Sequence, residues 1–220
     1  MQPTLFDTGN INMRQFEPAH SAIEGARTYT KGAYDSETPA NAMAKGVRGY
    51  RVQQAYKHAQ HAPETTGIRK SYESLRKGVN NQYEFMTRSH KEGGMGLRHQ
   101  TVNKDPYSDP KQMAADVNKG QIKTLSTKAT GGHAIFSDEE NDRFRAVHDV
   151  FGHAATGRDF SRSGEEAAFL SHRQMFPKRA LGALASETRG QNSYLNYGGG
   201  SFPDQSEKLI GLPGFAARAK

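Results

Sequence analysis

Cysteine and tryptophan are both absent from this chain of 220 residues. Without cysteine the protein has no disulfide bond, thiolate metal ligand or cysteine nucleophile, so histidine, aspartate or glutamate must hold any metal. Apolar residues are also scarce, at 34% of the chain with a mean hydropathy of −0.85. No stretch approaches the run of about 18 apolar residues that suggests a transmembrane helix, and residues 1–7 lack the features of a secretory signal. We therefore expect a soluble, cytoplasmic protein without a membrane partner.

Positive charge is concentrated in the middle of the chain. Residues 1–40 carry 3 basic and 5 acidic side chains, residues 41–130 carry 16 and 7, and residues 131–220 carry 11 and 11. Such a basic segment favours an anionic partner such as nucleic acid, although a solvated lysine- and arginine-rich helix surface gives the same composition. A basic, cysteine-free chain with an irregular first segment is also typical of phage-encoded proteins, located in the host cytoplasm or the virion.

The first segment, residues 1–40, contains several glycines and prolines and no sustained periodicity, which predicts an extended, flexible arm. Within it, residues 2–6 (Q-P-T-L-F) resemble the short peptides with which bacterial replication proteins bind the sliding clamp. Residues 41–220 are expected to form a single domain. Its basic portion spans residues 41–130, and a portion with a metal site spans residues 131–220.

Apolar periodicity predicts a mainly α fold with a minor component of short strands. Ser137 and Glu140 have the spacing of a capping box at the start of the helix that carries His148. Gly190 is expected to end the last helix, with a polar loop after it. Helices are expected at residues 41–61, 68–90, 110–118, 138–152, 164–176 and 178–188, and strands at residues 97–102 and 121–127.

Two histidines, His148 and His153, close a short segment of helical character. On a continuous α-helix, positions five apart differ by about 140°, so the two rings would face different directions. Gly152 is expected to take a left-handed conformation at the helix end, which would turn His153 back beside His148. Asp149 would then serve as an acceptor behind the site or as a partner for Arg145. The pair is therefore a candidate for two metal ligands.

A third ligand is needed, because two histidines alone bind a metal weakly. Glu187 is the favoured candidate, since its helical neighbours are small or apolar and indicate an inward carboxylate. Glu165, Glu166 and His172 are rivals, and Glu165 and His172, seven apart, share a helix face. The alternative is that no metal binds and the two histidines have only a structural role at a helix end.

Residues 148–153, H-D-V-F-G-H, resemble the motif H-[DE]-x-[FL]-G-H of the aromatic amino acid hydroxylases. In that family both histidines and a glutamate from a later helix bind iron(II). The resemblance, which extends by element order over residues 121–189, implies His148, His153 and Glu187 as ligands of iron(II), with zinc as the other metal that suits them. The segment after the second histidine differs from the family's and no pterin-stacking segment is found. The co-substrate is therefore left open between a pterin and 2-oxoglutarate.

Two hypotheses of function follow. The first is a mononuclear non-haem iron(II) oxygenase or hydroxylase whose small-molecule substrate is unknown, with an aromatic compound or a nucleobase as examples. In it, Arg158, Arg162 or Arg189 would clamp a carboxylate of the substrate or co-substrate; with zinc, the same ligands would activate water for hydrolysis. The alternative is a non-catalytic, basic protein that binds nucleic acid through residues 41–130 or is a structural component of a phage virion.

Overall fold

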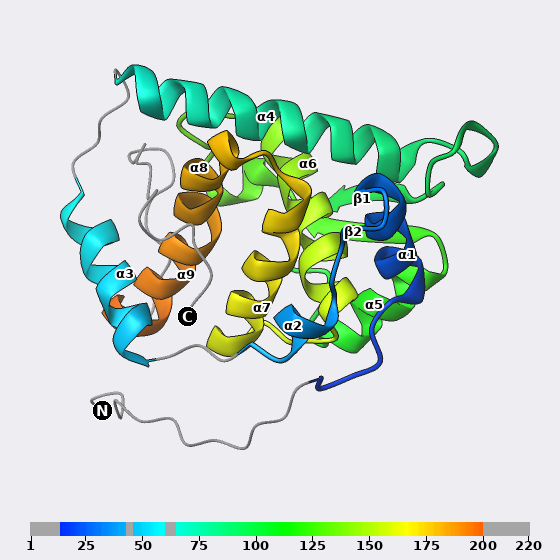
Figure 1. The fold of residues 1–220 in the computed structure, drawn as a ribbon, viewed down its shortest axis with the longest axis horizontal. Coiled ribbons are helices and arrows are strands. Elements are labelled where there is room, and N and C mark those ends of the chain that lie inside the picture. Colours follow the sequence, from blue (N-terminus) through cyan, green and yellow to red (C-terminus); the bar gives the residue numbers. More distant parts are fainter. Residues whose placement is uncertain (1–13, 43–45, 60–64, 200–220) are drawn as a thin grey trace.

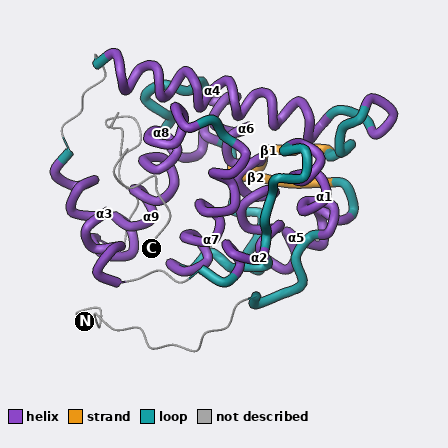
Figure 2. Tube along the Cα trace, in the orientation of Figure 1, coloured by secondary structure: helices purple, strands orange, loops and turns teal. Residues whose placement is uncertain are grey.

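The computed structural model describes residues 14–42, 46–59 and 65–199. This part of the chain is mainly helical with one small sheet, which confirms the expected fold class (Figures 1 and 2). Short 3-10 turns and three π-helical segments, at Asp149–Ala154, Ser186–Gly190 and Leu195–Gly199, join the main elements. The α-helices and strands are α1 (His20–Tyr29), α2 (Glu37–Ala40), α3 (Gly46–His58), α4 (Thr66–Thr87), β1 (Arg98–Val102), α5 (Pro110–Asn118), β2 (Gln121–Leu125), α6 (Asp138–His148), α7 (Arg162–His172), α8 (Leu181–Ala185) and α9 (Gln191–Tyr194).

The two strands pair in parallel, with Arg98 opposite Gln121 and Val102 opposite Leu125. A parallel pair needs a long crossover connection, and α5 supplies it. Asp109 caps α5 by accepting a hydrogen bond from the Lys111 backbone N–H at 2.9 Å, and proline at the first position suits the helix start. Both strands and α5 lie where the sequence predicts them.

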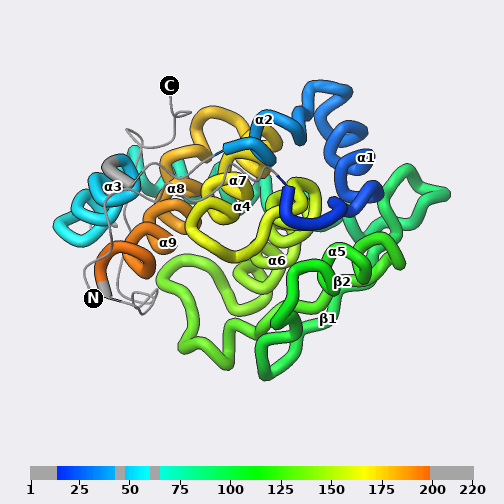
Figure 3. Tube along the Cα trace, turned by 90° about the horizontal axis from the view of Figure 1, so that it is seen from below, coloured from blue at the N-terminus to red at the C-terminus, as the bar shows by residue number. Residues whose placement is uncertain are grey.

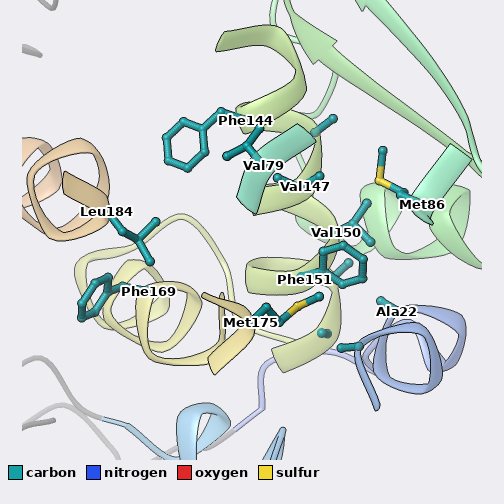
Figure 4. Close-up of a cluster of buried hydrophobic side chains, with 14 of the residues drawn as sticks. Ala22, Val79, Met86, Phe144, Val147, Val150, Phe151, Phe169, Met175 and Leu184 are labelled. Atoms are coloured by element: carbon teal, nitrogen blue, oxygen red, sulfur yellow. The ribbon is translucent and has the colours of Figure 1, made fainter. Parts of the chain in front are cut away.

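The core forms where α4, the longest helix described, crosses the other helices along one side of the molecule (Figure 1). Tyr72, Leu75, Val79 and Met86 repeat every three, four or seven residues and are all buried. Figure 4 shows Val79 and Met86 of α4 gathered with side chains of α6, the following π-helical segment, α7 and α8. This packing holds α6 and α7 at a defined distance. The other side chains labelled there include Phe144, Val147, Val150, Phe151, Phe169, Met175 and Leu184.

The capping box at the start of α6 is confirmed. The Ser137 hydroxyl accepts a hydrogen bond from the Glu140 N–H at 3.2 Å, and the Glu140 carboxylate accepts one from the Ser137 N–H at 3.0 Å. Ser161 caps α7 in a similar way through the N–H of Gly164. Both helices that flank the histidine pair thus begin at positions set by local sequence.

The prediction of an extended arm is wrong for most of residues 14–40, which contain α1 and α2. Ala22 and Ile23 of α1 are buried in the core. The Ala19 N–H donates to the carbonyl of Ala154 at 2.7 Å, so this segment packs against the chain just after His153. Residues 2–6 lie outside the described residues. Among the described helices, none is both long and apolar enough to cross a membrane.

Candidate metal centre

A π-helical segment brings the two histidines together. α6 ends at His148 and continues without a break into π-helix through Asp149–Ala154. Because π-helical hydrogen bonds join residues five apart, residues i and i+5 lie on the same face. The rings of His148 and His153 are accordingly 5.3 Å apart between centroids and nearly perpendicular, at 88°. The chain therefore places both imidazoles on one face by changing the helix period.

The predicted left-handed conformation of Gly152 is wrong. Gly152 lies within the π-helix and is not among the described glycines with positive φ. Glycine is needed here for close packing instead, because a Cβ at this position would lie only 3.0 Å from the Cβ of Ala168 on α7. Glycine thus lets α7 approach the two histidines closely, and α7 lies in the middle of the molecule, as the view from below shows (Figure 3).

Glu165, in the first turn of α7, is the carboxylate that meets the histidine pair. Its Oε2 lies 3.5 Å from His153 Nε2 and 3.9 Å from His148 Nε2. The amide of Asn192 donates to the same oxygen at 2.7 Å. One ligand atom from each of His148, His153 and Glu165 lies within 4.8 Å of the other two. These three residues form a cluster that could hold a metal ion.

The cluster brings ionisable groups together in a largely buried setting. Burial raises the pKa of Glu165, but attraction to His153 and His148 outweighs it and brings that pKa down to about 2. Burial lowers the pKa of His153, and the charge and hydrogen bonding of Glu165 and the charge of Asp149 turn this into a net rise. Burial also raises the pKa of Asp149 to about 6. The carboxylate is thus anionic, and a metal ion bound here would replace protons on the imidazoles as its positive partner.

The second nitrogen of each imidazole faces away from Glu165. His153 Nδ1 lies 3.4 Å from the carbonyl oxygen of Arg158, and His148 Nδ1 lies 3.3 Å from Nδ1 of His172. Metal-bound histidines commonly use their second nitrogen in this way. Two imidazole nitrogens and one carboxylate oxygen, without sulfur, form a donor set that suits iron(II) or zinc. The residues present therefore fit a mononuclear metal site.

A cavity of about 710 Å³ adjoins the cluster. Ligand pockets typically measure about 300–1,000 Å³, so this one suits a small molecule. At its edge Phe160 is 42% exposed and packs edge-on against His153, with ring centroids 4.9 Å apart. The remaining wall is mixed in polarity. Besides the three cluster residues and Phe160, it is lined by Asp105, Pro106, Tyr107, Thr124, Leu125, Thr130, Gly131, Asn141, Phe144, Arg145, Asp149, Glu187, Thr188, Gln191 and Asn192.

Glu187, the glutamate favoured from the sequence, lines the same cavity but is bonded to other residues. Its Oε2 accepts hydrogen bonds from His133 Nε2 at 3.0 Å and from Gln191 Nε2 at 2.6 Å. Its Oε1 accepts one from the hydroxyl of Tyr72. The cluster of three contains Glu165 instead, one of the rival candidates. The role of Glu187 as a ligand stays a prediction.

Gly190 does not end the last helix, contrary to prediction. The chain continues through the π-helical segment Ser186–Gly190 into α9, which begins at Gln191. Gln191 and Asn192 were expected in a polar loop, yet they donate to Glu187 and Glu165, respectively. An α-helix stop at glycine is a local tendency, and packing of α9 against α3 and α7 overrides it here. α9 thereby becomes part of the site.

The arginines proposed as a substrate clamp have partners inside the protein. Arg158 is buried and donates to the carbonyl of Ala40 at 2.9 Å. Arg189 forms a buried ion pair with Glu166, with 2.8 Å between Nε and Oε2. Neither is among the described residues that line the cavity, where the arginine is Arg145. Arg162, the third candidate, stacks its guanidinium over the Tyr197 ring at 4.9 Å.

No protein-family model, curated protein or solved structure matches this chain. The likeness to the aromatic amino acid hydroxylases therefore rests on residues 148–153 and the order of the elements around them. The cluster of His148, His153 and Glu165 rests on the geometry described above.

Proposed function

We propose that this protein is a metal-dependent oxygenase of the mononuclear non-haem iron(II) type, with His148, His153 and Glu165 as the protein ligands. The observation that carries the proposal is the position of this cluster on the wall of a cavity of small-molecule size. Two histidines and one carboxylate on one side of an iron(II) ion leave coordination positions open. In this protein those positions would face the cavity.

Glu165 is assigned as the third ligand because of its distances and its partners. Its Oε2 faces Nε2 of both histidines, and the one other bond described for it comes from Asn192. Glu187 meets His133, Gln191 and Tyr72 with its two oxygens and would have to give up or share these bonds to bind the same ion. The two glutamates make different predictions, so a pair of variants separates them.

Iron(II) in such a site supplies activation of dioxygen, with a pterin or 2-oxoglutarate as the co-substrate; zinc would instead activate water for hydrolysis. The chain's own residues bind and orient the substrate. Leu125, Phe144 and Phe160 give the cavity apolar contact area, and Arg145 is held at its wall by the Leu125 carbonyl and the Thr130 hydroxyl, each at 2.9 Å. These contacts favour a substrate with an apolar body and a polar group.

The first experiment measures bound metal in protein purified without a histidine tag and loaded with iron(II) without oxygen. We expect one iron per chain in the wild type and in Glu139→Ala, a surface control, and loss of iron in Glu165→Ala. Glu187→Ala should keep its metal if Glu165 is the ligand, whereas loss in Glu187→Ala alone would support the ligand set inferred from the family. Absence of metal from the wild type, with zinc as well as iron, would overturn the proposal. Oxygen consumption by the loaded protein then tests the reaction class.

Binding of nucleic acid is the second candidate, and the outer face of α4 favours it. Arg69, Lys70 and Lys77 are exposed along this helix, in the portion of the chain with excess positive charge, and Glu73 and Glu84 are the exposed acidic residues on it. Phosphate backbones bind such surfaces through release of counterions, which makes the affinity fall steeply with salt. This activity needs no metal, so loss of metal in Glu165→Ala would leave it unchanged.

A further inference from the structure

His148 is the first member of a chain of hydrogen bonds that runs from the cluster into the core. Its Nδ1 lies 3.3 Å from Nδ1 of His172, and His172 Nε2 lies 2.7 Å from Oε1 of Gln82. The amide nitrogen of Gln82 in turn donates to the carbonyl of Met175 at 3.1 Å. His172 and Gln82 are both completely buried, at 0% exposure. The contacts join α6, α7, α4 and the turn after α7.

The far end of this chain determines the direction of every hydrogen bond in it. The Met175 carbonyl can only accept, so the Gln82 NH₂ group must face it and the Gln82 oxygen must face His172. His172 Nε2 therefore carries a hydrogen and donates it to Gln82. The ring of His172 lies among Phe144, Phe151 and Phe176, with centroids 4.8–6.4 Å away.

No anion contacts His172 in the part of the chain described, since its two ring nitrogens face Gln82 and His148. A buried ring without an anionic partner is neutral, because the interior does not stabilise an isolated charge. A neutral His172 with hydrogen on Nε2 has a lone pair on Nδ1. That lone pair must accept from His148, so His148 carries a hydrogen on Nδ1 and turns its Nε2 toward Glu165, 3.9 Å away.

We propose that His172 and Gln82 are positioning residues that hold a hydrogen on Nδ1 of His148, so that Nε2 is the nitrogen that faces Glu165 and binds a metal ion. This inference rests on the proposed function for its purpose, although the tautomer itself exists without metal. α7 then serves the site twice, because Glu165 and His172, two turns apart, meet opposite sides of the His148 ring.

The tautomer can be measured directly in metal-free protein. Long-range ¹H–¹⁵N correlation spectra of ¹⁵N-histidine-labelled protein distinguish a protonated from an unprotonated ring nitrogen, and His148→Gln assigns the signals. We expect His148 to carry a hydrogen on Nδ1, and His172 to carry one on Nε2 and none on Nδ1. A His148 ring without hydrogen on Nδ1, or a His172 ring with hydrogen on Nδ1, would overturn the proposal. Because no metal is present, this result does not depend on the proposed function.

Metal affinity then tests the purpose of the contact. His172→Phe keeps the ring volume and removes the acceptor, and we expect it to weaken binding of zinc or cobalt(II) about 10- to 100-fold, as loss of such partners does elsewhere. His172→Asn keeps an amide oxygen near the position of Nδ1 and should recover most of the affinity. His99→Phe is the matched control. His99 bonds Tyr83 at 3.1 Å and Thr124 at 2.8 Å, away from the cluster, so binding should not change.

Wild-type affinity in a folded His172→Phe variant would overturn the positioning role, and so would equal losses in His172→Phe and His99→Phe. If His172→Phe does not fold, the spectra of the wild type still decide the tautomer. A wild type that binds no metal but shows the predicted tautomers would refute the proposed function and leave the hydrogen-bond chain supported.

Discussion

Replacement of Glu166 by alanine should destabilise the fold far more than loss of an exposed ion pair. Glu166 and Arg189 have side chains that are only 11% and 3% exposed, and the Arg189 guanidinium lies 4.4 Å from the ring centroid of Phe169. Burial and the charge of Arg189 lower the pKa of nearby Arg48, while Glu166 raises it. In Glu166→Ala, two guanidinium groups would remain close together without this carboxylate.

The expected loss follows from the removal of one member of a buried ion pair. Breaking a buried pair by removing one member typically costs about 3–5 kcal/mol. An exposed i,i+4 pair contributes about 0.3–0.5 kcal/mol, and Arg143–Glu139 is such a pair, with Glu139 75% exposed. We therefore expect Glu166→Ala to lower the free energy of unfolding by about 3–5 kcal/mol, and Glu139→Ala by less than about 0.5 kcal/mol.

Urea denaturation followed by circular dichroism measures both losses in metal-free protein. The double variant Glu166→Met/Arg189→Met should be more stable than Glu166→Ala, because apolar side chains of similar volume often replace a buried pair without loss. A loss in Glu166→Ala as small as that in Glu139→Ala would refute this reasoning. It would also reopen the prediction that Arg189 clamps a substrate.

Three further predictions concern the site, a helix start and the basic surface. Gly152→Ala should lower the free energy of unfolding by up to about 2 kcal/mol, since overpacking against Ala168 costs about 1–3 kcal/mol and the better helix propensity of alanine returns about 1 kcal/mol. Adding Ala168→Gly to this variant should partly restore the stability. If urea denaturation shows Gly152→Ala to be more stable than the wild type, this reasoning is wrong. Ser137→Ala removes a cap and should cost about 1 kcal/mol, measured as a lower melting temperature, whereas an unchanged melting temperature would argue against the capping box. In gel-shift assays, any binding of DNA or RNA should weaken steeply with salt, and it should weaken further in the double variant Lys70→Glu/Lys77→Glu. Binding whose affinity changes with neither salt nor these substitutions would show that the α4 surface is not the binding site.

Local sequence signals predicted the elements around the site. The spacing of Ser137 and Glu140 placed the start of α6, and the helix expected at residues 110–118 matches α5. The strands at residues 98–102 and 121–125 also match, and in β2 the buried Ile122 and Thr124 alternate with less buried residues, as in a strand with one covered face. Helix ends were less predictable, as at Gly190, where contacts with distant helices continue the chain in helical form.

By itself the sequence determined a mainly helical, cysteine-free protein and the histidine pair at 148 and 153 as the candidate ligands. Only the tertiary structure decided which carboxylate meets them, because the distance from Glu165 to the pair depends on how closely α7 packs against Gly152. It also decided that a π-helix, and not a left-handed glycine, aligns the two rings. Local spacing restricts which side chains share one helix face, whereas a site built from α6, α7 and α9 forms only when packing of the core brings those faces together.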